Sequence, residues 1–498
     1  MLHRLTSIYI ALLITVFLLA FPISGGYTVI MEFKHGLFLL ICGGYVLTIA
    51  VLRIIYVITG TQPMGCMKQK FKSIPLAAKF MPALLFFTVI SAVLSTYPGT
   101  FRGPFRQEGV FTIAIYVLGS LFISAYFRPQ KWMLFLLGAA AVPLCILALI
   151  QLTGANPFTL YPYGHNFYGS GIYYTGEFLS TVGNTAFLGA FLCLTVGVLG
   201  MALIKYDFRM RWLLSYPFFI SVLLVFKIGI DAALLAVLAG LIFMLPVAVT
   251  TRKTLANTLA ILALTLAAFA LSRGLVFTDG QVWLAPPRLI LVAAAGFTSL
   301  AAVLVSKIKF FTKIPTGWYR AGSAAVVLCG ICFALAYLWM YDGEPAGMVY
   351  EASQILRGRW HDDFGTRRVF IWRNILERTG RGTLLLGTGP DTLGYWDIPY
   401  FYRIDDAGRT FITNIDAAHN EFLHIFATGG LLSLFAYLGT LITALADWYR
   451  RPENKLSAVA GAGVLFYVIQ SFFGISQFIA APFFWGCLGV LMSSAESS

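Results

Sequence analysis

Charged side chains are scarce in this sequence. Asp, Glu, Lys and Arg make up 11% of its 498 residues, whereas soluble domains carry about 25%. Acidic residues are the rarer kind, with 21 Asp and Glu against 35 Lys and Arg. Because 59% of the residues are hydrophobic, this composition excludes an ordinary soluble domain and predicts a polytopic membrane protein.

Cysteine is also sparse, with seven in the chain. Cys66 falls in a polar loop and the other six fall in apolar segments, so the sequence suggests no disulfide framework. Cys329 and Cys332 stand three positions apart, a spacing that we assign to core packing in preference to a metal pair. The sequence also has no internal repeat and no low-complexity tract.

Long apolar runs are what the sequence has in abundance. The first follows Met1 without a convincing A-x-A cleavage site, so we interpret it as a retained span and not as a signal peptide. We predict 12 to 14 transmembrane helices and no convincing soluble domain. The fourteen candidate segments are 8–24, 37–58, 80–96, 109–126, 132–152, 182–204, 212–228, 231–249, 255–272, 287–305, 321–341, 430–446, 457–477 and 480–493.

Basic residues alternate between the loops. With a cytoplasmic N-terminus, the inner segments hold twenty of the 35 Lys and Arg, among them those of the lysine-rich loop at 60–79. The outer segments other than the longest loop hold six. This positive-inside pattern predicts that both termini are cytoplasmic. The net charge of +14 is thereby explained by topology and by anionic membrane lipid, and needs no nucleic-acid partner.

The longest outer loop, 342–415, divides the chain into a first bundle at 1–341, the loop, and C-terminal helices at 416–498. Loops of this length are usually functional. Within it, "TRRVFIWRNILERTG" has Val369, Trp372 and Leu376 at helical spacing and predicts an amphipathic helix at the membrane surface, ended by Gly380. "TLLLGTGPDT" predicts a short extended piece and a turn.

Two further outer segments carry polar or aromatic chemistry. The stretch 153–181 has eight aromatic residues, which favour an interfacial belt, with a sugar-stacking surface as the alternative. The stretch "YPGTFRGPFRQEG" at 97–109 places Arg102 and Arg106 on the outer side, against the charge trend. They either serve a function or contact lipid phosphate.

The sequence "DAAHNEFLHIFATGGLLSLFAYLG" then opens a new apolar segment with polar residues. Asp416 is a good N-cap and would put His419 in the first helical turn. The helix dipole would keep that imidazole neutral and available as a base. Gly429 and Gly430 predict a break. We expect His424 to point to the packed side.

Several of these stretches resemble motifs of the O-antigen ligase and O-antigen polymerase family of bacterial membrane proteins. "AHNEFLHIFATGGLLSLFAYLG" resembles its His-Asn motif, "RVFIW" its Arg-x-x-x-Trp, and "GTGPDT" its Gly-x-Gly-Pro turn. "FRGPFRQEG" resembles an Arg-x-Glu-Gly element of one branch. "STVGNTAFLGAFL" resembles its Gly-Asn segment, although Asn184-Thr185-Ala186 replaces the frequent Asn-Pro-Asn. Together they cover roughly 95–490.

The resemblance implies an all-α, GT-C-like fold with one large, partly helical outer loop. It also implies an inverting glycosyltransferase in the plasma membrane, without metal or cofactor. A glycan would pass from a polyprenyl (undecaprenyl) diphosphate carrier to a hydroxyl of a glycan, lipid or protein acceptor. Arg368 would hold the diphosphate and His419 would be the base, and both are assigned as catalytic. The substrate-binding candidates are Arg102, Arg106, Lys227, Arg367, Trp372, Asn184, Asn420, Glu421 and Asp391.

The sequence departs from the family at one place. A Ser-Arg pair that opens a mid-chain span in many relatives is missing from "FKIGIDAALLAVLAG". Lys227 or Arg106 would replace its cation, or Lys227 and Asp231 merely form an ion pair that closes a turn. Ligase and polymerase both remain open, as do two other classes, a lipid-linked glycan transporter and a non-enzymatic glycan assembly protein.

Overall fold

The computed structural model describes residues 1–60, 75–169, 177–278, 281–286, 288–398, 401–404, 410–413 and 415–493. Most of the lysine-rich loop at 60–79 and the centre of the aromatic stretch 153–181 lie outside these residues. The chain is almost wholly helical, with three two-stranded antiparallel hairpins. The helices of the first half are α1 (Leu2–Leu12), α2 (Ile30–Phe38), α3 (Gly44–Ile58), α5 (Leu76–Leu94), α6 (Val110–Tyr126), α7 (Lys131–Gln151), α8 (Thr185–Lys205) and α9 (Ser215–Ile228).

The second half continues in the same way. Its helices are α10 (Asp231–Phe243), α11 (Leu245–Ala248), α12 (Arg252–Gly274), α13 (Leu289–Lys307), α14 (Thr316–Met340), α15 (Gly347–Leu356), α16 (Phe364–Arg378), α17 (Glu421–Arg450), α18 (Lys455–Ser471) and α19 (Ala481–Leu491). The hairpins are β1 (Phe178–Leu179) with β2 (Gly183–Asn184), β3 (Leu275–Thr278) with β4 (Gln281–Leu284), and β5 (Phe401–Ile404) with β6 (Thr410–Thr413).

The described helices support the prediction of a multi-pass membrane protein. Nine of them are long and apolar enough to cross a membrane, and five more apolar helices of 10–17 residues accompany them. Each of the fourteen predicted apolar segments overlaps one of these helices. The five shorter helices fall below the roughly 20 residues that a helix needs to span on its own.

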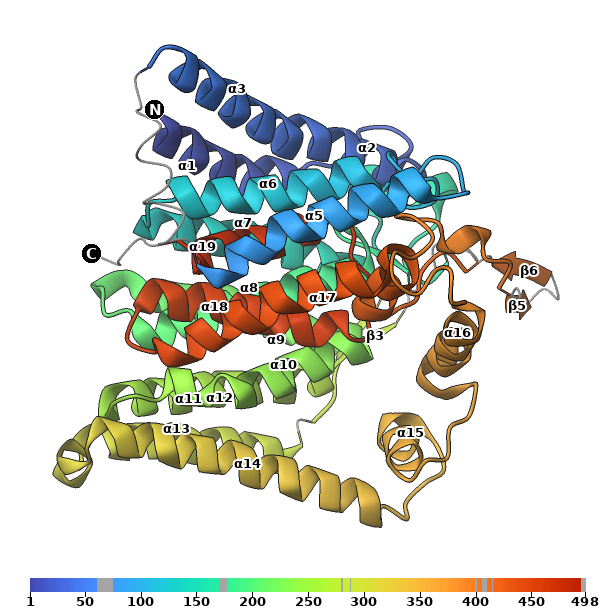
Figure 1. Cartoon of the computed structure of the whole chain (residues 1–498). Helices are drawn as coiled ribbons and strands as arrows, with labels where there is room; N and C mark the ends of the chain where they lie inside the picture. The colour runs from blue at the N-terminus through green and yellow to red at the C-terminus, as the bar shows by residue number, and fades with distance from the viewer. Residues whose placement is uncertain are drawn as a thin grey trace.

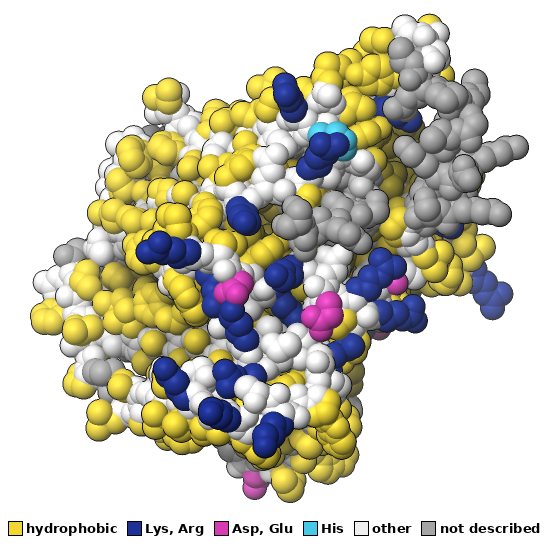
Figure 2. Space-filling model, turned by 90° about the vertical axis from the view of Figure 1, so that its left-hand side faces the viewer, with side chains coloured by type: hydrophobic (Ala, Val, Ile, Leu, Met, Phe, Trp, Pro, Cys, Tyr) yellow, Lys and Arg dark blue, Asp and Glu magenta, His cyan; other side chains and the backbone are white. Residues whose placement is uncertain are grey.

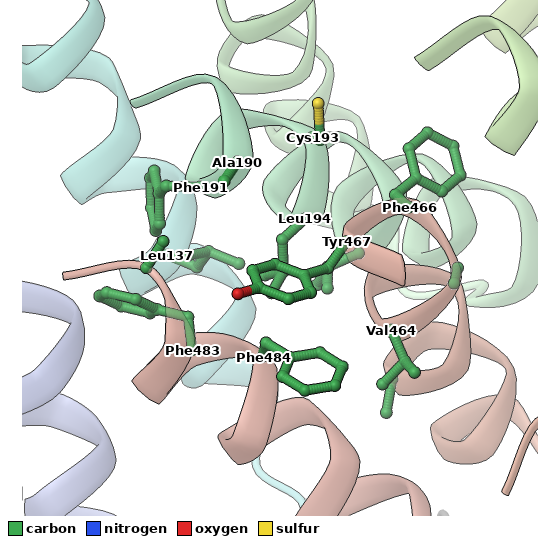
Figure 3. Packing of buried hydrophobic residues seen from close by; sticks show 14 of the residues in the cluster. Leu137, Ala190, Phe191, Cys193, Leu194, Val464, Phe466, Tyr467, Phe483 and Phe484 are labelled. Carbon is green, nitrogen blue, oxygen red and sulfur yellow. The ribbon is translucent and has the colours of Figure 1, made fainter. Parts of the chain in front are cut away.

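The helix α8 forms the centre of the bundle. Its spanning window is entirely buried, because the sequence "TAFLGAFLCLTVGVLGMALI" is apolar all round and offers no polar face to expose. Phe191 packs edge-on against Phe483 with ring centroids 4.8 Å apart. Beside them, the rings of Tyr467 and Phe484 stack at 4.3 Å (Figure 3). This core fixes α18 and α19 against the N-terminal helices.

The two ends of the bundle carry different parts of the chain. At one end, which we call the terminal end, His3 Nδ1 lies 2.6 Å from the Tyr126 carbonyl and the Ser124 hydroxyl lies 3.4 Å from the Met492 carbonyl. The helices α15 and α16 lie at the opposite end, the loop end (Figure 1). Figure 2 shows Lys and Arg side chains gathered on the terminal end. The terminal end and the 342–415 loop thus lie at opposite ends of the bundle (Figure 1), and which end faces the cytoplasm stays a prediction.

The helices α13 and α14 form the most exposed part of the bundle. Only 6% of the spanning window of α14 is buried, and large apolar side chains such as Phe333 and Trp339 are exposed along it. Cys329 and Cys332 are likewise exposed on α14. Our assignment of this cysteine pair to core packing is therefore wrong, because α14 makes few contacts and turns most of its surface outward.

The 342–415 loop lies at the loop end of the bundle, and its elements match the prediction only in part. The amphipathic helix is α16, with Val369 buried and Leu376 exposed. It ends at Arg378, and the capping position is Thr379 in an extended conformation, not Gly380. The stretch "TLLLGTGPDT" forms turns and no strand. The hairpin β5–β6, in contrast, was not predicted.

The helix α17 is broken at Gly430, where φ is +73° and ψ is −178°. The backbone N–H groups freed by the break, those of Leu431 and Leu432, donate to the carbonyls of Leu384 and Leu385 at 2.9 and 3.2 Å. From the other side, the Gly389 N–H donates to Thr428 O at 2.8 Å. The predicted break and the predicted glycine turn thus satisfy each other's backbone groups.

Gly430→Ala is expected to destabilise the protein by at least about 2 kcal/mol. A Cβ atom at this position would lie 2.3 Å from the Leu385 carbonyl, and its backbone lies in the left-handed region. Gly296→Ala on α13 is the control, since a Cβ atom there meets nothing within 4 Å. Thermal unfolding of the purified protein in detergent measures both. Equal unfolding temperatures for the two variants would contradict the account of this break.

Candidate functional site

His419 lies directly before α17, held between two backbone contacts. On one side Trp372 Nε1 donates to the Ala418 carbonyl at 2.9 Å. On the other side Asn420 caps α17, its Oδ1 accepting from the Leu423 N–H at 2.9 Å. The His419 side chain is exposed, and its φ of +49° places it in the left-handed region. The structure therefore presents this imidazole on a short, conformationally restrained segment.

Asn420, and not Asp416, is the N-cap, so the prediction that His419 sits in the first helical turn is wrong. Asp416 is used elsewhere, because Arg106 donates through Nη1 to both of its carboxylate oxygens at 3.1 and 3.2 Å. Arg106 Nη2 also donates to Gln477 Oε1 at 3.2 Å. Arg106 thus ties the 97–109 segment to the chain before His419 and to the α18–α19 connection.

Asp391 holds the 97–109 segment through its backbone. Its Oδ2 accepts from the backbone N–H groups of Phe105 and Arg106 at 2.9 and 2.7 Å. Asp391 is 1% exposed and has a φ of +60°. Burial raises the pKa of this carboxyl to about 6, against the opposing effect of the hydrogen bonds from Arg106 and Phe105. A restrained, buried carboxylate therefore holds the arginine segment at the loop end.

Arg368 lies at the start of α16 and partly buried. Its Nη1 donates to the Gly365 carbonyl at 2.8 Å, whereas its Nε has no hydrogen-bond partner. The positive charge of Arg368 interacts electrostatically with His419. The carboxylates of Asp231 and Glu351 interact in the same way with Arg368. The neighbouring Arg367 is half exposed and pairs with Asp363 at 3.3 Å. Of these two arginines, Arg368 is the one that belongs with His419.

The surroundings of His419 favour its neutral form. Although part of the His419 side chain reaches the surface, the chain packed around it desolvates the imidazole and lowers its pKa. The positive charges of Arg368 and then Arg106 act in the same direction, and Asp416 acts in the opposite direction. A histidine with an ordinary pKa of about 6.5 is already mostly neutral at pH 7. The lowered pKa keeps this imidazole free to accept a proton in more acidic solution as well.

A cavity of about 80 Å³ with a mostly apolar lining and a few polar groups lies beneath this segment, inside the loop end of the bundle. Arg106, Asp391, Glu421 and His424 contribute polar groups to it. The remaining lining residues are Leu84, Thr88, Glu108, Ile113, Tyr116, Pro390, Ala417, Ile425, Thr428, Gly429, Ser433, Tyr437, Ile475, Ser476 and Trp485. We call it the loop-end cavity. His424 lines this cavity inside the bundle, in agreement with the prediction that it points to the packed side.

Two glutamates at the cavity are hydrogen-bonded to tyrosines. Tyr437 Oη donates to Glu421 Oε1 at 2.5 Å, across 16 positions of one helix. In a straight helix the two Cα atoms would be about 24 Å apart, so this contact requires the break at Gly430. Tyr116 Oη donates to Glu108 Oε1 at 2.8 Å.

Glu108→Gln is expected to stabilise the protein increasingly as the pH rises. Burial raises the pKa of Glu108 to about 8, with the hydrogen bond from Tyr116 acting in the opposite direction. The folded state therefore holds a proton that the unfolded state releases above about pH 4.5, and folding stability falls as the pH rises from there to about 8. Glutamine has no proton to lose. The unfolding-temperature difference between the variant and the wild type should grow across this range, and a constant difference would refute the assignment.

Several predicted residues make contacts with other parts of the chain. Asn184 caps α8, accepting from the Ala186 N–H at 2.8 Å. Lys227 donates to the Leu275 carbonyl and lies over the Phe277 ring, so its predicted ion pair with Asp231 is not formed. Arg102 is exposed and close to His35. The observed contacts of Asn184 and Lys227 are structural, and Arg102 lies in an exposed position near His35.

Three contributors were not among the predicted site residues: Glu108, Gln477 and Tyr437. Glu108 had a visible signal, a carboxylate next to an apolar segment in "FRQEG". Gln477 and Tyr437 had none, because the first reaches Arg106 over 371 positions and the second reaches Glu421 through a helix break. Sequence spacing does not encode either contact.

A groove of about 760 Å³ runs between α16 and α17 beside Asn420 and Trp372. Its lining is almost entirely apolar, apart from Arg373, Glu377 and Asn420. The apolar lining residues are Trp360, Val369, Trp372, Leu376, Phe422, Leu423, Phe426, Leu431, Leu434 and Phe472.

Comparisons of the sequence with models of protein families and with characterised proteins found no match to this chain.

Proposed function

We propose that the protein transfers a glycan from a polyprenyl diphosphate carrier to an acceptor hydroxyl at the outer face of the plasma membrane, as a ligase or a polymerase. The observation that carries the proposal is the juxtaposition of His419 and Arg368 at the loop end. A restrained, neutral imidazole stands there within electrostatic reach of a guanidinium that has an unpartnered Nε. The family resemblance of both motifs supports the same reaction.

In this proposal the acceptor hydroxyl oxygen attacks the anomeric carbon of the donor. The carbon–oxygen bond to the diphosphate breaks, and the hydroxyl proton passes to the His419 imidazole. Arg368 stabilises the negative charge that develops on the leaving diphosphate, for which a planar guanidinium is well suited. The apolar groove between α16 and α17 takes the first units of the polyprenyl chain, since it opens beside Trp372 and Asn420.

A transporter of lipid-linked glycans is the second candidate, supported by the fourteen apolar helices. The distribution of buried carboxylates favours transfer. Glu108, Asp391 and Glu421 all line the loop-end cavity, whereas the cavity of about 560 Å³ near Lys131 has no acidic residue among its described lining residues. A path for a polar glycan across the membrane would need such groups along the interior of the bundle, whereas these three carboxylates lie at one end.

Turnover in detergent micelles distinguishes the two candidates. The purified full chain is mixed with an undecaprenyl-diphosphate-linked oligosaccharide and an oligosaccharide acceptor, and the products are identified by mass spectrometry. A transferase releases undecaprenyl diphosphate and lengthens the acceptor. A transporter leaves the donor unchanged, because micelles offer no second side.

The topology is predicted to place the terminal end in the cytoplasm, because Lys and Arg gather there. Single cysteines at exposed Arg381 and Lys309, in a background without native cysteines, test this in intact cells. An impermeant maleimide should label position 381 and leave position 309 unlabelled until the cells are opened. The reverse pattern would contradict the outer placement of the site.

A further inference from the structure

The loop-end cavity contains polar atoms that the protein itself leaves without partners. They are Arg106 Nε, Asp391 Oδ1, Glu421 Oε2, His424 Nδ1 and Ser433 Oγ. Asp391, Glu421 and Ser433 are 1%, 3% and 1% exposed, respectively. A buried polar group without a hydrogen bond costs about 1–3 kcal/mol. Five such atoms around one cavity indicate that something else completes their hydrogen bonds.

The chemistry of these atoms selects a kind of ligand. Two carboxylate oxygens and a hydroxyl oxygen accept hydrogen bonds, whereas Arg106 Nε only donates. A diphosphate is disfavoured, because Asp391, Glu421 and Glu108 would all repel it when ionised and would leave it few donors. Sugar hydroxyl groups both donate and accept, so they match this set.

The cavity also offers aromatic surface. The rings of Tyr116 and Trp485 stack 6.0 Å apart with 12° between their planes, and Tyr437 lies 6.1 Å from Trp485 on another side. All three residues line the cavity. Aromatic rings beside hydrogen-bonding groups suit a sugar, which has apolar C–H edges as well as hydroxyls. The volume of about 80 Å³ holds about five waters, which corresponds to one hydroxyl-bearing edge of a ring.

We infer that the loop-end cavity is a subsite for a sugar, which binds by inserting one hydroxyl-bearing edge among Arg106, Asp391, Glu421, His424 and Ser433. In the reaction proposed above, on which this assignment rests, it is the terminal sugar of the acceptor. His424 is close enough to His419 for their charges to interact. A sugar anchored in the cavity therefore lies near the base, while the donor diphosphate stays with Arg368.

Direct binding tests the subsite without any donor. Methyl glycosides of glucose, galactose, mannose and N-acetylglucosamine are added singly to the purified full chain in detergent. Saturation-transfer NMR then reports contact with the sugar protons. At least one glycoside should give a signal that is strongest on one edge of its ring. The absence of a signal from all four would overturn the inference and leave a cavity that holds water only.

Two variants locate the binding. Ser433→Leu fills the cavity, and Glu421→Gln keeps its shape but turns an acceptor into a donor. Each should weaken glycoside binding by at least about tenfold, the effect expected from losing a hydrogen bond to a charged group. Ser306→Leu, at an exposed site on α13, is the matched control and should bind as the wild type does. Unfolding temperatures identify any variant that fails to fold, and Glu421→Gln then decides. Unchanged binding in a folded variant would overturn the assignment.

Kinetics separate this inference from the proposed function. The cavity variants should raise KM for the acceptor at least about tenfold and leave KM for the lipid-linked donor within about twofold. If transfer occurs and acceptor KM does not change, the sugar subsite is wrong and the transferase stands. If wild-type protein binds glycosides in the cavity but transfers nothing, the proposed function is wrong and the subsite stands.

Discussion

Replacing His419 by alanine is expected to lower the transfer rate by about 10²–10⁴-fold, the usual contribution of a general base. Trp372 and Arg106 hold the segment that carries His419 through hydrogen bonds to Ala418 and Asp416. The exposed side chain of His419 makes no hydrogen bond to the described residues. The variant should therefore fold normally. Because the base acts on the acceptor, donor affinity should stay within about twofold of the wild type.

His361→Ala is the control for this substitution. His361 is a histidine of the 342–415 loop, with a side chain that is 66% exposed and paired with Asp363. Its removal should leave transfer within about twofold of the wild type. A His419→Ala variant that retains near-normal transfer, or that loses donor binding in proportion to activity, would contradict the assignment of the base.

The pH dependence follows from the same group. The base is active when deprotonated, so transfer should fall as the pH drops through its pKa. Because the surroundings of His419 lower that pKa, the midpoint of the acid limb of kcat/KM should lie below the ordinary imidazole value of about 6.5. This limb should vanish from the residual activity of His419→Ala. An unchanged acid limb in the variant would identify a different base.

Arg368→Ala is expected to reduce transfer by about 10²–10³-fold, comparable to the loss of a donor that stabilises developing charge. Arg368→Lys keeps the positive charge but loses the planar fork, so a smaller loss of about tenfold is expected. The transfer assay on purified protein measures both variants. Arg381→Ala, at an exposed position of the same loop, should remain within about twofold of the wild type. Full activity in Arg368→Ala would show that Arg368 has no role in transfer and that α16 is only a surface helix.

The helical framework of this protein was predictable because lipid imposes a simple rule. A span must be apolar and helical to satisfy its backbone in hydrocarbon, and each predicted apolar segment overlaps a helix. The break at Gly430 was predictable for a related reason, since paired glycines tolerate a conformation that other residues do not. The α16 helix was visible through the spacing of Val369 and Trp372.

The connections within the site were not predictable, because they join residues far apart in the chain. Asp416 was a chemically reasonable cap, but Arg106, 310 positions away, competes for its carboxylate, and Asn420 caps the helix. Lys227 was expected either to replace the family's cation or to pair with Asp231, and it donates instead to the carbonyl of Leu275, in a hairpin that follows a different helix.

The anomeric configuration of the product tests the central claim most directly. The account holds that an acceptor hydroxyl, activated by His419, displaces the diphosphate in a single step. Wild-type protein is incubated with an undecaprenyl-diphosphate-linked glycan of known anomeric configuration and an acceptor, and the new linkage is determined by NMR. The account predicts inversion at the anomeric carbon together with release of undecaprenyl diphosphate. Retention of configuration, or a donor that is never cleaved, would contradict it.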